Sequence, residues 1–272
     1  MQLKTIRHLW GVEEPPSTFF TKVRAENYHG VESALPASGT ETAFRGLLDE
    51  NGLEYIAQIF TDGPTFVEHI ESFRRQARAA VEMKAVMVNC HGGKDGWSLA
   101  DSLHFYRAAI EIERDLGIPV AHETHRGRIL FNPWITRDIL NEIPDLALCC
   151  DFSHWVCVAE RLLPDCGEII AQCAERCLHL HARVGYEQGP QVPDPRAPEY
   201  QVHVETHEKW WDIIWSAQEK SGMTYSYLTP EFGPPTYLPT LPFSNKPVAS
   251  LEEICLWQVE RQRQRFHNRV AK

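Results

Sequence analysis

The sequence predicts one (β/α)8 barrel, because short apolar runs alternate with longer amphipathic segments along all 272 residues. A doubly wound open sheet would show the same alternation, but it normally carries a glycine-rich phosphate fingerprint after its first strand, and LWGVEEPP lacks that spacing. The chain is therefore expected to form a single barrel domain over residues 1–272. Its predicted strands span residues 4–10, 30–35, 53–60, 85–90, 118–124, 146–152, 177–183 and 225–232.

The segments between these runs have helical patterns with recognisable ends. Residues 66–83 and 101–117 place apolar side chains at helical spacing. Asn132, followed by proline, predicts the N-cap of another helix. Ser250 and Glu253 have the spacing of a capping box at the start of the last helix.

Two stretches read as long loops on the carboxyl side of the strands, about 184–204 and 232–249. Both are rich in proline or glycine, and loops of this length in a compact domain are commonly functional. We expect both to border the active site of the barrel.

Composition narrows the classes of partner. The formal net charge of −10 disfavours a protein whose main partner is a nucleic acid backbone, although a local basic pocket for a small anion remains compatible. Neither a signal-peptide pattern nor a long apolar run is present, so a soluble, cytoplasmic protein without membrane partners is expected. The eight cysteines are scattered, mostly within apolar runs or helical patterns, which favours reduced thiols over a disulfide framework.

The last four predicted strands each end on a potential metal ligand. Any one of these carboxylates alone would more simply be solvated or cap a turn. Together they would repel one another unless a cation lay between them. Carboxylate and imidazole ligands suit Mn²⁺, Zn²⁺, Co²⁺ or Mg²⁺. The sequence therefore predicts one divalent metal ion in the barrel mouth, with the ligands Glu123, Asp151, His181 and Glu231.

These strand ends, in HETHRGR, DFSHW, HLHAR and TPEFG, resemble the xylose-isomerase-like superfamily, the sugar phosphate isomerase/epimerase group of metal-dependent barrels. The resemblance implies that the four ligands bind one ion and that Glu123 and Glu231 also act as the acid/base pair. It further implies that His154 and Arg183 contact substrate. His91 and His8, at the ends of the fourth and first predicted strands, complete the expected substrate-binding set. The segment ARVGYEQG departs from the usual epimerase pattern after the metal histidine.

The resemblance implies an isomerase or epimerase that acts on a sugar, a sugar derivative or a related hydroxy-ketone through an enediolate, and it suggests a homodimer. Two alternatives stay open. One is a phosphodiesterase like the apurinic endonucleases, because these also carry the Asp-x-x-His spacing of Asp151 and His154. The other is a metal-binding barrel without catalytic activity.

Overall fold

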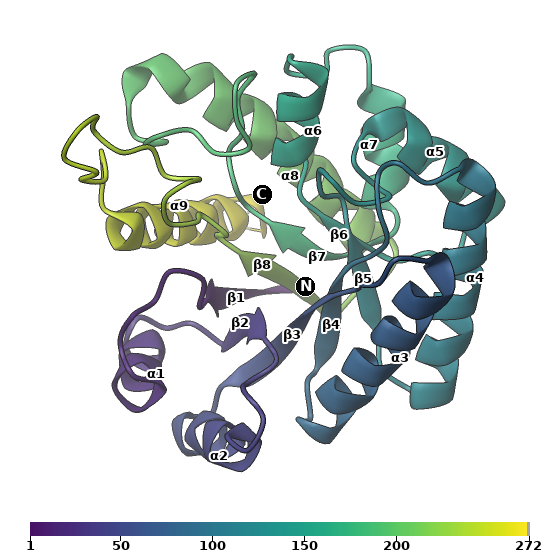
Figure 1. Ribbon diagram of the computed structural model, residues 1–272. Coiled ribbons are helices and arrows are strands. Elements are labelled where there is room, and N and C mark those ends of the chain that lie inside the picture. The colour runs from purple at the N-terminus through teal and green to yellow at the C-terminus, as the bar shows by residue number, and fades with distance from the viewer. Residues whose placement is uncertain (271–272) are drawn as a thin grey trace.

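The computed structural model describes residues 1–270 and confirms the predicted barrel. Within these residues eight parallel strands pair in chain order and close on themselves, β1 with β8. Figure 1 shows the strands at the centre of the molecule, with the helices around them. The strands are β1 (Gln2–His8), β2 (Gly30–Ala34), β3 (Glu54–Phe60), β4 (Met87–His91), β5 (Val120–Glu123), β6 (Leu148–Cys150), β7 (Cys177–His181) and β8 (Tyr225–Thr229).

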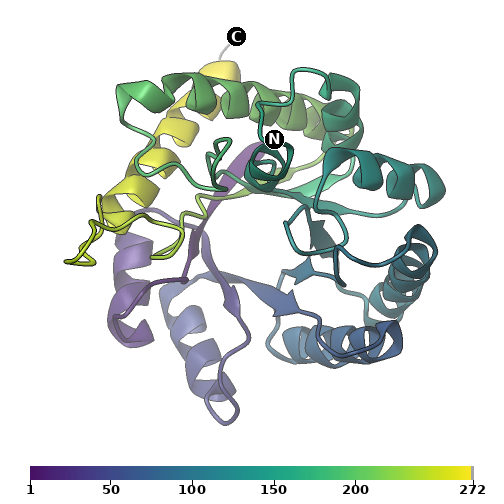
Figure 2. The ribbon, with the colours of Figure 1, turned by 45° about the horizontal axis from the view of Figure 1, so that its top comes forward.

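Helices form the outer ring of the barrel, as Figure 2 shows. Two predicted caps are present: Asn132 Oδ1 accepts the amide of Ile135 at 3.0 Å, and Ser250 Oγ accepts the amide of Glu253 at 3.3 Å. The helices are α1 (Pro16–Ala25), α2 (Glu41–Asn51), α3 (Phe66–Glu82), α4 (Leu99–Leu116), α5 (Pro133–Glu142), α6 (Ser153–Ala159), α7 (Gly167–Ala174), α8 (Gln201–Lys220) and α9 (Leu251–Val270), with a 3-10 turn η1 (Pro198–Tyr200).

The barrel interior changes from apolar to polar along the strands. A small inner core consists of Ile6, Ile56, Met87, Ala121 and Cys149. Because strand side chains alternate between the two faces, the residues two positions further along each strand also point inward. Those positions are polar and buried: His8, Gln58, Asn89, Glu123 and Asp151. The barrel interior is therefore polar at the carboxyl ends of the strands and apolar in the layer below them.

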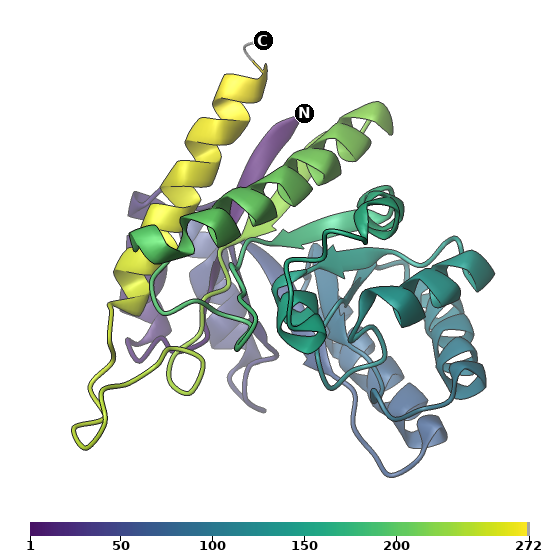
Figure 3. The same cartoon turned by 90° about the horizontal axis from the view of Figure 1, so that it is seen from above.

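Two long loops join the strands to α8 and α9 at this end of the barrel. The first is shorter than predicted, because α8 begins at Gln201. Figure 3 shows the loop before α9 projecting beyond the end of that helix. The buried side chain of Gln191 connects the two loops: it accepts the amide of Gly233 at 2.6 Å and donates to the carbonyl of the same residue at 3.1 Å.

Within residues 1–270, no helix is both long and apolar enough to cross a membrane.

Candidate metal-binding and catalytic site

The structure brings the four predicted ligand side chains together at the ends of β5, β6, β7 and β8. One donor atom from each of Glu123, Asp151, His181 and Glu231 lies within 4.8 Å of the others. His181 Nδ1 is 2.8 Å from Glu231 Oε2, 3.6 Å from Glu123 Oε2 and 4.0 Å from Asp151 Oδ2. These atoms define the four-residue cluster.

The cluster has unused donor atoms that fit a cation. Glu123 Oε1 is buried and has no hydrogen-bond partner among the described residues. Glu231 Oε2 and His181 Nδ1 are also buried; they lie 2.8 Å apart as an ion pair but do not have hydrogen-bond geometry. Buried polar atoms are normally paired, because leaving one unpaired costs about 1–3 kcal/mol. A divalent ion would satisfy all three atoms and offset the repulsion between the carboxylates.

Burial and the neighbouring charges shift the pKa values of the four side chains in the cluster. Burial alone would lower the pKa of His181, but the surrounding acidic groups raise it well above its ordinary value. Burial raises the pKa of Glu123, and it raises that of Asp151 to about 6 despite the nearby Arg183. Burial alone would also raise the pKa of Glu231, yet His181 and Arg183 bring it well below its usual range. A cation that binds Nδ1 of His181 must therefore displace the proton on that ring.

Glu32 on β2 supports the cluster from below and was missed by the sequence reasoning. This fully buried carboxylate accepts His181 Nε2 at 3.0 Å, Asn89 Nδ2 at 2.9 Å and the Thr229 hydroxyl at 2.7 Å. Because Nε2 donates its hydrogen to Glu32, Nδ1 of His181 faces the three acids of the cluster and can bind a metal ion once its proton is displaced. Carboxylates commonly fix metal-binding histidines in this way. A signal for Glu32 was present: it is an acid inside a short apolar run.

Arg183 and His154, both predicted to contact substrate, lie beside Asp151. The Arg183 guanidinium donates to Asp151 Oδ2, lies 3.4 Å from Glu231 Oε2 and contacts His154 Nε2 at 2.6 Å. Burial lowers the pKa of His154 well below its ordinary value, with the charge of Arg183 among the further causes. Arg183 lines the cavity described below, whereas His154 does not. A direct substrate contact therefore has geometric support for Arg183 but not for His154.

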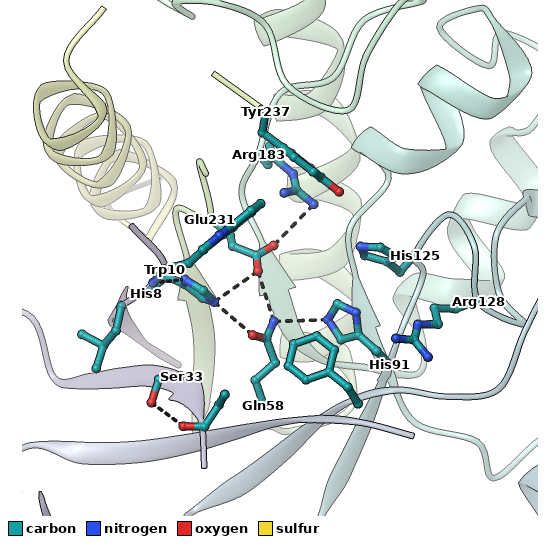
Figure 4. A pocket seen from close by; sticks show the side chains of 13 residues that line it. His8, Trp10, Ser33, Gln58, His91, His125, Arg128, Arg183, Glu231 and Tyr237 are labelled. Atoms are coloured by element: carbon teal, nitrogen blue, oxygen red, sulfur yellow. Dashed lines mark hydrogen bonds and ion pairs between the residues drawn. The ribbon is translucent and has the colours of Figure 1, made fainter. Parts of the chain in front are cut away.

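His8 and His91, the other two predicted substrate residues, flank the two glutamates that the sequence predicts as the acid/base pair. His8 Nε2 is 3.3 Å from Glu231 Oε1, and His91 Nε2 is 2.7 Å from Glu123 Oε2. Gln58 on β3 joins the two sides, because its amide nitrogen lies 3.2 Å from both His91 Nε2 and Glu231 Oε1. Figure 4 shows these contacts around Glu231. Gln58, like Glu32, was not predicted.

A cavity of about 510 Å³ opens above the cluster, a volume suited to one small molecule. Apolar side chains form much of its wall, and Tyr237 comes from the long loop before α9. The lining residues are His8, Leu9, Trp10, Ser33, Ala34, Gln58, Phe60, His91, His125, Arg128, Arg183, Glu231 and Tyr237.

A second group of potential ligands adjoins the cluster. His91, Glu123 and His125 each offer a donor atom within 4.8 Å of the other two, so Glu123 belongs to both groups. The rings of His91 and His125 are 4.5 Å apart, centroid to centroid. Cys149, His179 and His181 form a third such group below the cluster. There His179 Nε2 already bonds the Thr229 hydroxyl at 2.8 Å, and burial raises the pKa of the Cys149 thiol well above its usual value.

Comparison with protein families gives one match over most of the chain. A family model described as a xylose isomerase-like TIM barrel matches residues 20–207. A search of the curated proteins finds no match.

Solved structures share the fold at low sequence identity. A 3-keto-D-glucoside 4-epimerase from E. coli aligns with a TM-score of 0.64 at 10% identity and covers 97% of this chain and 99% of its own. A xylose isomerase-like TIM barrel protein from Mycobacterium smegmatis, in complex with magnesium, aligns at 0.64 and 14%, covering 96% and 95%. Endonuclease IV from Thermus thermophilus aligns at 0.59 and 12%, covering 98% and 99%. Such similarity establishes the fold and leaves the reaction to be argued from the site.

Proposed function

This chain belongs to the xylose isomerase-like TIM barrel family, and from that premise we propose that it is a metal-dependent isomerase or epimerase. Its substrate is a sugar, a sugar derivative or a related hydroxy-ketone. The observation that carries the proposal is the four-residue cluster, whose buried potential ligand atoms face one another beside a cavity of small-molecule size. The fold similarity to an epimerase supports the same reaction class.

The proposed ligands are Glu123, Asp151, His181 and Glu231, with Mn²⁺, Zn²⁺, Co²⁺ or Mg²⁺ as the ion. A bound dication would polarise the carbonyl of a hydroxy-ketone and so acidify the neighbouring C–H bond. Glu32 holds His181 with Nδ1 directed at the ion site. Arg183 compensates part of the negative charge of Asp151 and Glu231.

Glu123 and Glu231 are the proposed acid and base. Glu123 is the last residue of β5 and Glu231 lies two residues after the end of β8, so they reach the site from different parts of the barrel wall. One glutamate removes the acidified proton and gives an enediolate. Return of a proton to the opposite face gives epimerisation, and return to the neighbouring carbon gives aldose–ketose isomerisation. The opposite pKa shifts of the two groups match such a division of roles.

The test of this function is a metal analysis of the purified protein, followed by a screen of ketoses and keto-acids in D2O. We expect about one divalent ion per chain and deuterium incorporation next to the carbonyl of at least one compound. Mass spectrometry and NMR measure the exchange. Metal-bound protein that exchanges no deuterium with any member of the screen would favour a non-catalytic barrel instead.

Adding a divalent ion to chelator-treated protein is expected to raise its melting temperature. A ligand at 100 times its Kd stabilises the folded state by about 2.7 kcal/mol, which for chains near this length corresponds to roughly 5–10 °C. Differential scanning calorimetry with and without the ion measures the shift. The variant Asp151→Asn should lose most of this shift. An equal shift in Asp151→Asn would place the bound ion outside the cluster.

Metal affinity is expected to rise with pH. The pKa of His181 is raised well above its ordinary value in the metal-free protein, so near pH 7 the cation must displace a proton from this ring. One displaced proton gives about a tenfold gain in affinity per pH unit. Below about pH 6 the dependence should become steeper, because the pKa of Asp151 is raised to about 6 and a second proton then competes. Calorimetric titration in buffers of different ionisation enthalpy counts the protons released, and zero release at pH 7 would contradict this account.

Phosphodiester hydrolysis is the second candidate, and the observation that favours it is the second ligand group at His91, Glu123 and His125. Occupation of both groups would give adjacent ions that share Glu123, an arrangement used for phosphoryl displacement. The fold similarity to endonuclease IV is compatible with it, whereas the net charge of −10 opposes binding to duplex DNA. Two or more ions per chain together with cleavage of an abasic duplex would favour this function over isomerisation.

A further inference from the structure

Arg128 stands apart from the other charged side chains of the cavity. Arg183, the other arginine in the lining, is paired with both Glu231 and Asp151. In residues 1–270, no carboxylate oxygen lies within 4.0 Å of a side-chain nitrogen of Arg128. Within the same residues this side chain forms only two hydrogen bonds. Its Nη1 donates to the backbone carbonyls of Thr61 at 3.0 Å and Gly93 at 3.3 Å. A guanidinium on the cavity wall thus keeps its full positive charge.

The guanidinium is also held in one orientation. The two carbonyls that bind Nη1 belong to the loops after β3 and β4, and the amide of Arg128 itself donates to the carbonyl of His125 at 3.2 Å. This leaves Nε and Nη2 without a partner in the described chain. These two nitrogens lie on one edge of the guanidinium, which is the geometry that binds a carboxylate or phosphate through two parallel hydrogen bonds.

We propose that Arg128 is an anion-binding residue that makes the enzyme selective for hydroxy-ketones bearing a carboxylate or phosphate group. The inference rests on the proposed function, because it assumes that the hydroxy-ketone end of the substrate faces the four-residue cluster. In Figure 4, His91 and His125 lie between Glu231 and Arg128 along the cavity wall. The substrate therefore extends from the cluster past these two rings, and its anionic group meets Nε and Nη2 of Arg128.

The apolar remainder of the cavity strengthens this selection. Leu9, Trp10, Phe60 and Tyr237 form apolar and aromatic parts of the wall, and Arg183, the other arginine in the lining, is already paired with Asp151 and Glu231. Burial lowers the pKa of Arg128, which reflects the cost of keeping an uncompensated guanidinium partly away from water. An anionic group of the substrate offsets this desolvation cost by pairing with the guanidinium, whereas a neutral substrate of the same size does not.

Three matched probes test the proposal: dihydroxyacetone, hydroxypyruvate and dihydroxyacetone phosphate, which share a hydroxy-ketone end and differ in charge. Calorimetric titration of the full chain, with Mg²⁺ and after removal of metal, gives their affinities. At least one anionic probe should bind the wild type about 10-fold or more tightly than dihydroxyacetone, also without metal. The preferred anion identifies the substrate as a carboxylate or a phosphate. Equal affinity for all three probes would overturn the proposal.

Variants separate Arg128 from the general charge of the region. Arg128→Gln should lose the preference for the anion while its affinity for dihydroxyacetone stays the same. Arg126→Gln is the matched control, because Arg126 belongs to the same loop, lies over the Tyr237 ring at 5.0 Å and does not line the cavity. Its preference should be unchanged. An anion preference that persists in Arg128→Gln, or that falls equally in both variants, would refute the assignment.

A second variant and a second measurement complete the test. If Arg128→Gln does not fold, Arg128→Lys is the second variant, because it replaces the two guanidinium nitrogens by a single ammonium group. The anion preference of Arg128→Lys should fall by about threefold or more. An unchanged preference in that variant would also refute the assignment. Deuterium exchange into the same probes reports the proposed function separately. Exchange without anion preference leaves the isomerase standing and removes the anion site, whereas the reverse pattern leaves the anion site and removes the isomerase.

Discussion

Replacing Glu123 or Glu231 with glutamine is expected to slow solvent-deuterium incorporation into a hydroxy-ketone substrate by roughly 10²–10⁴-fold, the usual contribution of a positioned acid or base. Glutamine has nearly the same shape but cannot take up the proton from carbon. Both side chains are buried in the cluster, so the substitution changes little surface and the barrel should remain folded. NMR detection of deuterium in the recovered substrate measures the effect.

Each of these variants must be compared at equal metal content, because both glutamates are proposed ligands. Glu187→Gln is a suitable control: Glu187 is also a rim carboxylate, but it pairs with His203 at 2.9 Å and does not line the cavity. That variant should exchange deuterium at the wild-type rate. Wild-type exchange in metal-loaded Glu123→Gln or Glu231→Gln would rule out the two-glutamate scheme.

The variant Glu32→Gln is expected to weaken divalent metal binding by about 10–100-fold, although Glu32 is not a proposed ligand. Glu32 is fully buried and accepts Nε2 of His181, which directs Nδ1 toward the cluster. An uncharged amide would hold the ring less firmly, and it could also present its own N–H group to Nε2. Either change would leave Nδ1 less available to the ion. Titration of chelator-treated protein with Zn²⁺ or Mn²⁺ measures the affinity.

Glu54→Gln provides the control for this prediction. Glu54 begins β3, at the opposite end of the barrel, where it pairs with Lys4. Removing its charge should leave metal affinity unchanged. If Glu32→Gln binds the ion as tightly as the wild type, Glu32 does not position His181 and its role is only in packing.

The barrel and the cluster could be predicted because both follow from simple periodicity. Parallel strands of one barrel place their carboxyl ends at a common rim, so acids that end successive apolar runs must approach one another. Glu123 and His181 are the last residues of their strands, and Asp151 follows its strand directly. His179 lies two residues before His181 on β7, so both side chains point to the same face of the strand, and their ring centroids lie 4.7 Å apart.

The other residues of the site could not be predicted, because the pattern of apolar residues in the strands does not identify them. Gln58 shares the inward parity of the other site residues, but a neutral amide in an apolar run gives no clear chemical signal. Arg128 and Tyr237 come from loops, whose paths are set by tertiary contacts such as the bonds from Arg128 to the carbonyls of Thr61 and Gly93. No pattern within the sequence of a loop predicts which of its side chains will enter the cavity.

The most direct test of the proposed metal centre is an anomalous difference map from crystals grown with Zn²⁺ and measured at the zinc absorption edge. The account predicts a strong peak about 2.0–2.2 Å from one atom of each of Glu123, Asp151, His181 and Glu231, with Nδ1 as the histidine ligand. A zinc-loaded crystal whose only peaks lie elsewhere, for example between His91 and His125 without Asp151 and His181, would contradict it.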